Sequence, residues 1–167
     1  MIILGVDPGY AIVGIGVIEY VGNKFRTLEY GAITTPAGMP TTERLKKIYQ
    51  EMEMYLDKYN PDAVAIEELF FNSNQKTAIN VAQARGVLLV SVANRNIPIC
   101  EYTPLQVKQS VTGYGRADKK QIQTMVKMLL GLNAIPKPDD AADALAIAIC
   151  HAHSNKMNNM FGINKVR

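Results

Sequence analysis

Carboxylate side chains stand at three places in this sequence where a folded chain would hold them close to its apolar interior. Asp7 ends an apolar run and begins an Asp-Pro-Gly turn, and Glu67 ends a second apolar run. Asp140 and Asp143 lie three residues apart at the head of the alanine-rich stretch 138–153, so they share one face of the helix predicted there. Burying a carboxylate is costly unless it is paired with positive charge or bound to a metal.

The residue types indicate which metal such a group would take. Four carboxylates without His or Cys suit a hard cation such as Mg²⁺ or Mn²⁺ rather than zinc. Two such ions, about 3.5–4 Å apart, can activate a water and stabilise the leaving oxygen when a phosphodiester is attacked. We therefore predict a site for two Mg²⁺ ions, with Mn²⁺ as a substitute.

Helix capping is the structural alternative to a metal site. An acidic residue at a helix N-terminus complements the helix dipole, and this role is sufficient for Asp139. Capping does not account for Asp143, which lies inside the predicted helix, or for Glu67 in its buried run. His151 and His153 are two residues apart and cannot share a helix face, and His151 lies about 12 Å beyond Asp143 along a continuous helix. We predict structural or surface roles for both histidines.

Charge is unevenly distributed along the 167 residues, although the net charge is only +3. Residues 1–75 carry six Lys or Arg against ten Asp or Glu, whereas residues 76–137 carry nine against two. This asymmetry predicts a basic surface for a polyanion. Charge alone does not separate that interpretation from ordinary solvated helix faces.

The cellular setting follows from what the composition excludes. The N-terminus has no basic leader, and the longest apolar run, 141–150, contains an Asp and is too short to span a bilayer. Cys100 and Cys150 lie in apolar segments, which is typical of reduced core thiols. We predict a cytoplasmic protein with no membrane association.

Hydrophobic periodicity predicts the order of the elements. Three meandering strands come first, then helices and strands alternate, and helices end the chain. The predicted strands are 1–9, 11–22, 24–36, 62–71 and 97–104, and the predicted helices are 41–59, 72–96, 105–115, 117–132 and 138–153. This order favours an α/β fold in which helices flank a mixed β-sheet, formed by a single domain over 1–155 with a flexible tail over 156–167.

Five motifs, in order from residue 1 to about 153, resemble the RuvC family of bacterial Holliday-junction resolvases: IILGVDPG, AIEELFF, QARGV, QVKQSVTGYGRADKKQIQ and DAADALAIAICHAH. The resemblance implies an RNase H-like fold and a homodimer. It implies symmetrical nicking of four-way DNA junctions in recombination and repair, dependent on Mg²⁺ or Mn²⁺, with 5′-phosphate and 3′-hydroxyl ends. It also implies partnership with the branch-migration proteins RuvA and RuvB.

The resemblance assigns roles to seven residues. Four are implied metal ligands and catalytic residues, one is a base-stacking aromatic, and two are phosphate-binding lysines; in that order they are Asp7, Glu67, Asp140, Asp143, Phe70, Lys108 and Lys119. Tyr114 and Arg116 are further candidate DNA contacts, while the role of Lys120 stays open.

Two acidic residues depart from the family pattern. Glu68 stands where relatives often carry Gln, and strand alternation points it away from Glu67. Asp139 directly precedes Asp140, so the assignment of the metal ligand to Asp140 depends on the register of the predicted helix.

Three other functions are compatible with parts of the pattern. An RNase H-like nuclease acting on RNA would share the fold and the carboxylates. A non-catalytic junction-binding module would need the carboxylates only for structure, which four intact acids argue against. An actin-like ATPase would share the Asp-Pro-Gly turn, but 167 residues leave no room for its second lobe.

Overall fold

A five-stranded mixed sheet forms the centre of the molecule, which we describe from a computed structural model covering residues 1–69 and 75–161, without the side chains of 75, 76 and 156–161. The strand order is β3-β2-β1-β4-β5. The strands are β1 (Ile2–Asp7), β2 (Ile12–Val21), β3 (Lys24–Thr34), β4 (Ala63–Glu67) and β5 (Ile99–Tyr102). The helices are α1 (Thr41–Tyr59), α2 (Gln75–Ala93), α3 (Pro104–Thr112), α4 (Lys119–Leu129) and α5 (Asp139–Phe161).

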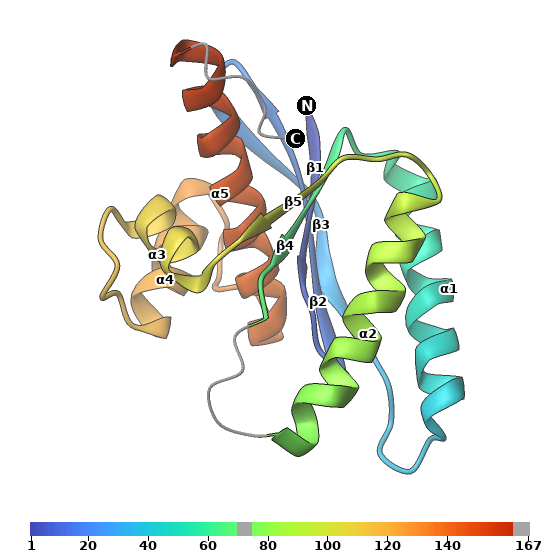
Figure 1. The fold of residues 1–167 in the computed structure, drawn as a ribbon. Coiled ribbons are helices and arrows are strands. Elements are labelled where there is room, and N and C mark those ends of the chain that lie inside the picture. Colours follow the sequence, from blue (N-terminus) through green and yellow to red (C-terminus); the bar gives the residue numbers. More distant parts are fainter. Residues whose placement is uncertain (70–74, 162–167) are drawn as a thin grey trace.

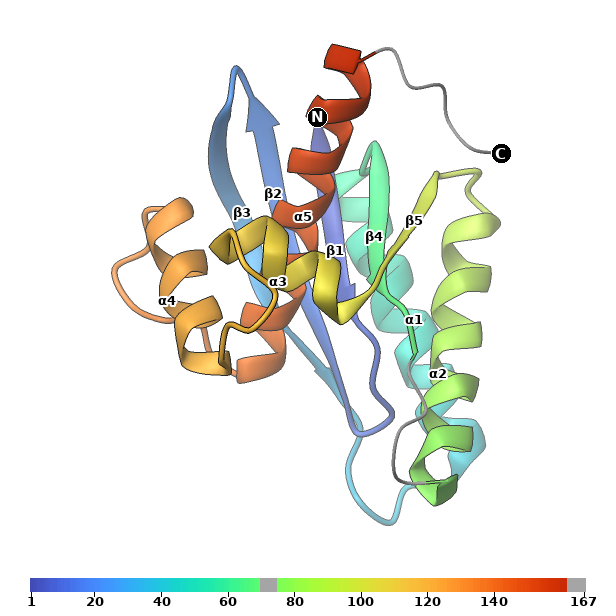
Figure 2. The ribbon, with the colours of Figure 1, turned by 60° about the vertical axis from the view of Figure 1, so that its left-hand side comes forward.

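The predicted order of elements is confirmed. β1, β2 and β3 form an antiparallel meander, whereas β4 and β5 run parallel to β1. Helices α1 and α2 cover one face of the sheet, and α3, α4 and α5 cover the other (Figures 1 and 2). Most bounds shift by one to three residues, and two differ by more: β4 ends at Glu67 rather than at 71, and α5 continues past the predicted 153 to Phe161. The flexibility of the C-terminal tail stays a prediction.

Strand alternation sorts the side chains of the sheet between its two faces. Leu4 and Val6 of β1 join the core formed with α1 and α2, whereas Ile3 joins the core formed with α5. Ala65 of β4, in register with Gly5, also belongs to the α5 side. Because alternation has a period of two, Asp7 and Glu67 must lie on the α5 face with these residues.

Glycines let α5 approach the sheet closely. A Cβ atom at Gly14 would lie 2.0 Å from the carbonyl oxygen of Asp140, and one at Gly5 would lie 2.0 Å from the carbonyl oxygen of Ala144. The α5 backbone thus occupies the space that side chains would fill. The first turn of α5 is fixed beside Gly14, the residue in register with Asp7.

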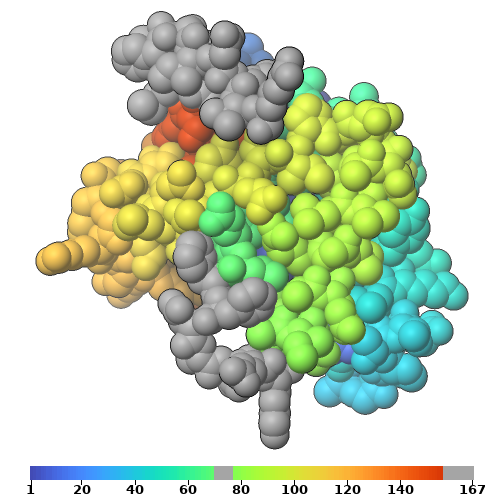
Figure 3. All heavy atoms as spheres, in the orientation of Figure 1, coloured from blue at the N-terminus to red at the C-terminus, as the bar shows by residue number. Residues whose placement is uncertain are grey.

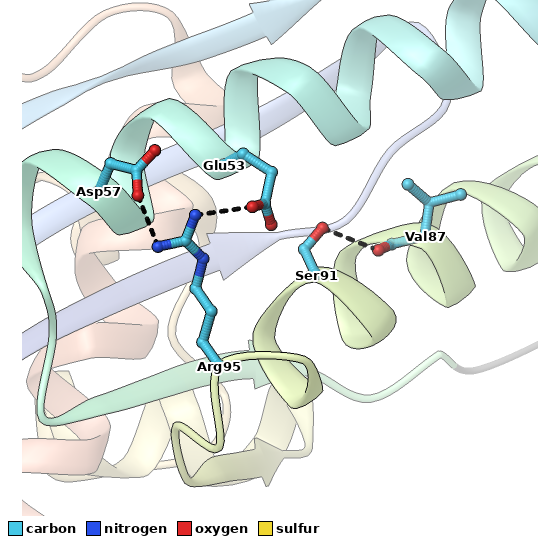
Figure 4. Close-up of polar contacts among 5 residues, drawn as sticks. All are labelled: Glu53, Asp57, Val87, Ser91 and Arg95. Atoms are coloured by element: carbon cyan, nitrogen blue, oxygen red, sulfur yellow. Dashed lines mark hydrogen bonds and ion pairs between the residues drawn. The ribbon is translucent and has the colours of Figure 1, made fainter.

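The opposite layer is held together by apolar packing and by one arginine. Figure 3 shows α2 across much of the face in view, with α1 beside it. Arg95, just beyond α2, donates to Glu53 at 2.6 Å and to Asp57 at 2.6 Å, both on α1 (Figure 4). The hydroxyl of Ser91, a buried residue, donates to the carbonyl of Val87 within α2. The two Arg95 contacts hold the C-terminal end of α2 against α1.

Among the helices that the structure describes, none is long and apolar enough to cross a bilayer.

The packing of α5 generates a test in a matched pair of glycine variants. Gly14→Ala should lower the free energy of unfolding by about 1–3 kcal/mol or more, because the new methyl group meets backbone that cannot yield without moving α5. Gly31→Ala in β3 is the control, since its Cβ would meet only the hydroxyl of Tyr55 at 3.7 Å. Urea unfolding of both variants measures the difference, and equal stabilities would contradict the close-approach argument.

Candidate active site

Two carboxylates meet at the carboxyl ends of neighbouring parallel strands. Asp7 is the last residue of β1 and Glu67 the last of β4, and the pair Val6 and Ile66 immediately before them is in register. Both acids lie on the α5 face of the sheet. The sequence predicts Glu67 near the end of its strand and Asp7 at the turn after its own, and the parallel pairing of β1 with β4 brings the two ends together.

Helix α5 adds the other two predicted acids. Asp140 lies in its first turn, where its backbone packs on Gly14 opposite Asp7. Asp143 lies one turn later and lines a pocket of about 260 Å³ together with Glu67. The four carboxylates therefore come from β1, β4 and α5 and gather at one edge of the sheet.

Burial and mutual repulsion make this group electrostatically unfavourable when it is ionised. Burial, followed by the charges of Glu67, Asp143 and Asp140, raises the pKa of Asp7 to about 8. Burial, followed by the charge of Asp143, raises the pKa of Glu67, and burial likewise raises that of Asp143. Shifts of this kind, from desolvation and neighbouring like charges, concentrate at functional sites.

Lysines provide the positive charge nearest to this group. Lys119, the first residue of α4, donates to Asp143 at 3.1 Å and lies 3.8 Å from Asp139. Lys137 pairs with the other oxygen of Asp139 at 2.7 Å. Asp139 thus shares Lys119 with Asp143 and has a second partner in Lys137.

A second lysine enters from α3. Lys108 lines the same pocket as Glu67, Asp143 and Lys119, and its charge lowers the pKa of Glu67 against the larger effect of burial. Both supporting helices begin with a capping box: Thr103 and Gln106 close the start of α3, and Asp118 with its N3 residue closes that of α4. The two caps fix where the lysine-bearing helices begin.

The donor set fits hard divalent cations. All four acids offer oxygen ligands, three of them carry a raised pKa, and a bound cation would relieve the repulsion that raises it. As the side chains stand, no three Asp, Glu, His or Cys residues of the described part of the chain converge on one point. Holding a cation would require these carboxylates to turn toward one another and Asp143 to part from Lys119.

The other predicted residues lie apart from this cluster or outside the part of the chain that the structure describes. Phe70 and its neighbour Phe71 lie outside the described residues, so the stacking role stays a prediction. The amide of Glu68 continues the ladder to Tyr102 at 2.9 Å, and alternation directs the Glu68 side chain away from the α5 face. Tyr114 and Lys120 line a separate groove of about 410 Å³ along α4.

Sequence reasoning missed the residues that support the site. Gly14 carries no chemistry, yet it determines where Asp140 lies. Gln123, buried on α4, helps to lower the pKa of Asp139 after the larger effect of Lys137. The alternation of Gly14 and Gly16 in a strand was the available signal, because glycine in a strand marks a close backbone approach.

Comparison with known proteins identifies the family. Residues 3–151 match the sequence model described as Crossover junction endodeoxyribonuclease RuvC. The chain belongs to the RuvC family. A RuvC of Alkaliphilus oremlandii is 65% identical over 98% of this chain and 99% of its own length. That of Clostridioides difficile is 60% identical over 94% of this chain and 93% of its own.

Solved RuvC structures share the fold. The structure of Thermus thermophilus RuvC in complex with Holliday junction substrate has a TM-score of 0.90 at 37% identity, covering 95% of this chain and 96% of that one. The yeast mitochondrial Holliday junction resolvase Ydc2, at 16% identity and a TM-score of 0.66 over 95% of this chain and 83% of its own, is similar in fold alone. The expected RNase H-like α/β architecture is confirmed.

The electrostatics of the site generate a pH prediction. The folded-state pKa of Asp7, about 8, lies above its ordinary 3.8, so the folded protein binds this proton more tightly than the unfolded chain does. The contribution of this protonation to the free energy of unfolding is fully present below about pH 4, and it is lost as the pH rises through 8. In EDTA at pH 8, Asp7→Asn should exceed the natural protein in free energy of unfolding by a few kcal/mol, at ~1.4 kcal/mol per unit of pKa shift.

Urea unfolding in EDTA at pH 5 and pH 8 measures this difference, which should shrink at the lower pH. Added Mg²⁺ should stabilise the natural protein more than the variant, because a ligand that binds only the folded state raises stability. A natural protein whose stability is the same at both pH values would contradict the assignment of the raised pKa to Asp7.

Proposed function

We propose that this protein is a crossover junction endodeoxyribonuclease that resolves four-way DNA junctions by paired, metal-dependent nicks in homologous recombination and repair. The observation that carries the proposal is the neighbourhood of four carboxylates, two of which line one pocket with two lysines, in a chain that belongs to the RuvC family. The Thermus thermophilus relative, at 37% identity, binds a Holliday junction substrate. The products would carry 5′-phosphate and 3′-hydroxyl ends.

The four carboxylates would hold the divalent cations, for which we propose Mg²⁺ with Mn²⁺ as a substitute. When bound, these cations would supply Lewis acidity toward the phosphodiester and lower the pKa of an attacking water. Asp7 must first lose a proton, because its pKa of about 8 favours the neutral acid near neutral pH.

Two lysines would bind the DNA backbone around the cut. Lys108 lies beside Glu67, and Lys119 lies beside Asp143, so each can bind a phosphate next to a metal-binding carboxylate. An ammonium group at this position also stabilises charge that develops on the phosphate during attack. Phe70, beyond the described residues, is proposed to stack on a base at the crossover, where stacking contributes about 1–3 kcal/mol.

A homodimer would bring two such sites to one junction. A two-fold axis in the protein matches the near two-fold symmetry of the substrate, so two strands of like polarity can be cut symmetrically. The apolar face of α1 and α2 fits this role: Val90 is 55% exposed and Ile79 is 65% exposed. A Cβ at Gly86 would meet open space, so this helix face stays free for a partner.

The cellular setting that we propose follows the family. The protein would act in the bacterial cytoplasm, alongside RuvA and RuvB, on junctions that those proteins move along DNA.

A cleavage assay on a synthetic four-way junction with a mobile core tests the proposed function. We expect paired nicks at symmetrical positions in Mg²⁺, none in EDTA, and a loss of about 10²–10³-fold or more in Asp143→Asn, which keeps the shape and removes the charge. Junction binding by this variant should survive. Tight binding without metal-dependent cutting would instead indicate a binding module, and preferential cutting of an RNA–DNA hybrid would indicate an RNA-directed nuclease.

The dimer surface has a test of its own. Val90→Asp places a charge on the exposed face of α2 and should convert the dimer to a monomer in light scattering coupled to size-exclusion chromatography. Met128→Asp is the matched control, because Met128 is 67% exposed on α4, in the opposite layer. A monomeric natural protein, or a dimer that tolerates Val90→Asp, would rule out this surface.

A further inference from the structure

The helix that carries Asp140 and Asp143 also holds the segment that carries Lys108. This segment begins at Tyr102, the last residue of β5, and continues through Thr103 into α3. Tyr102 is in register with Glu67 and lies on the same face of the sheet. Lys108 follows one and a half helical turns later, so its position depends on how this segment sits on α5.

A buried hydrogen bond joins the start of the segment to α5. The hydroxyl of Tyr102 lies 2.8 Å from Nδ1 of His151, and the two rings meet edge to face with centroids 6.0 Å apart. His151 is only 7% exposed. Burial raises the pKa of Tyr102 to about 12 and lowers that of His151, so at neutral pH the phenol donates and the neutral imidazole accepts.

A second histidine of α5 binds the other end of α3. Nδ1 of His153 lies 3.1 Å from the hydroxyl of Ser110 and 3.2 Å from its carbonyl oxygen. The side chains of Val107 and Val111 also pack against α5, but apolar contacts are non-directional and allow a helix to slide or rotate. Hydrogen bonds require short distances and near-linear geometry, so they fix the register of α3 on α5.

We propose that Tyr102 and His151 are positioning residues that hold Lys108 at the distance from Glu67 and Asp143 at which it binds a backbone phosphate of the junction. The proposal rests on the proposed function, in which Lys108 contacts DNA. It gives the His151 side chain, eight residues beyond Asp143, a role in the site without contact with substrate or metal. One rigid helix thereby sets both the carboxylates and the lysine.

Salt dependence of junction binding measures whether Lys108 reaches its phosphate. Each phosphate contact contributes about 0.9 to the slope of the logarithm of the binding constant against the logarithm of salt concentration. Binding is measured by fluorescence anisotropy on a four-way junction in EDTA, so that no cutting occurs. Lys108→Ala should reduce the slope by about 1. Tyr102→Phe, which removes only the hydroxyl, should reduce it as much, and Tyr102→Phe with Lys108→Ala should reduce it no further.

A conservative pair at His151 separates positioning from general stability. His151→Asn retains an acceptor oxygen close to the place of Nδ1 and should keep the natural slope. His151→Leu removes the acceptor, and its slope should be smaller by about 1. Tyr59→Phe is the matched control, since it removes a phenol that donates to Glu29 on the other face of the sheet. It should leave the slope unchanged. Thermal unfolding verifies that each variant is folded, and Tyr102→Phe carries the test if His151→Leu does not fold.

Amide hydrogen exchange of Pro104–Thr112 gives a readout that does not depend on DNA. Tyr102→Phe should accelerate exchange in α3, whereas His151→Asn and Tyr59→Phe should not. A natural slope and unchanged exchange in Tyr102→Phe would overturn the positioning role. Lys108→Ala could leave the slope unchanged while Tyr102→Phe accelerates exchange in α3. In that case Lys108 does not contact a phosphate, and only the role of Tyr102 in fixing α3 on α5 is supported.

Discussion

Repulsion among carboxylates gathered in a partly buried place is the constraint on which the rest of this structure depends. Asp7, Glu67 and Asp143 each have a raised pKa because burial and neighbouring charges oppose their ionisation. Such a group gathers only if packing elsewhere in the fold supplies the free energy that holds it together. A divalent cation bound at this site would offset the repulsion between the carboxylates and so favour its own binding.

Packing of α5 on the sheet supplies the free energy that keeps the carboxylates together. The glycines of β1 and β2 let the helix backbone rest directly on the strands, and its alanine-rich face buries almost completely. One helix then carries two acids at its N-terminal end and two histidines near its middle. Rigid secondary structure transmits position along its length, so contacts at His151 and His153 bear on groups near Asp143.

The lysines balance this arrangement without neutralising it. Lys119 pairs with Asp143 through a half-exposed ion pair, an interaction that solvent weakens and that competing partners can displace. Lys108 acts on Glu67 only through its charge. In the proposed function, Lys119 would exchange Asp143 for a phosphate of the DNA.

The sequence by itself determined the order of the elements and the family, and it named four acids and two lysines as candidates, because periodicity and motif spacing are local properties of the chain. Only the tertiary structure decided that Asp7 and Glu67 share a face, since this follows from the parallel pairing of β1 with β4. It also decided that Lys119 engages Asp143 and that His151 engages Tyr102. These contacts join residues far apart in the chain, and no local pattern encodes the packing that brings them together.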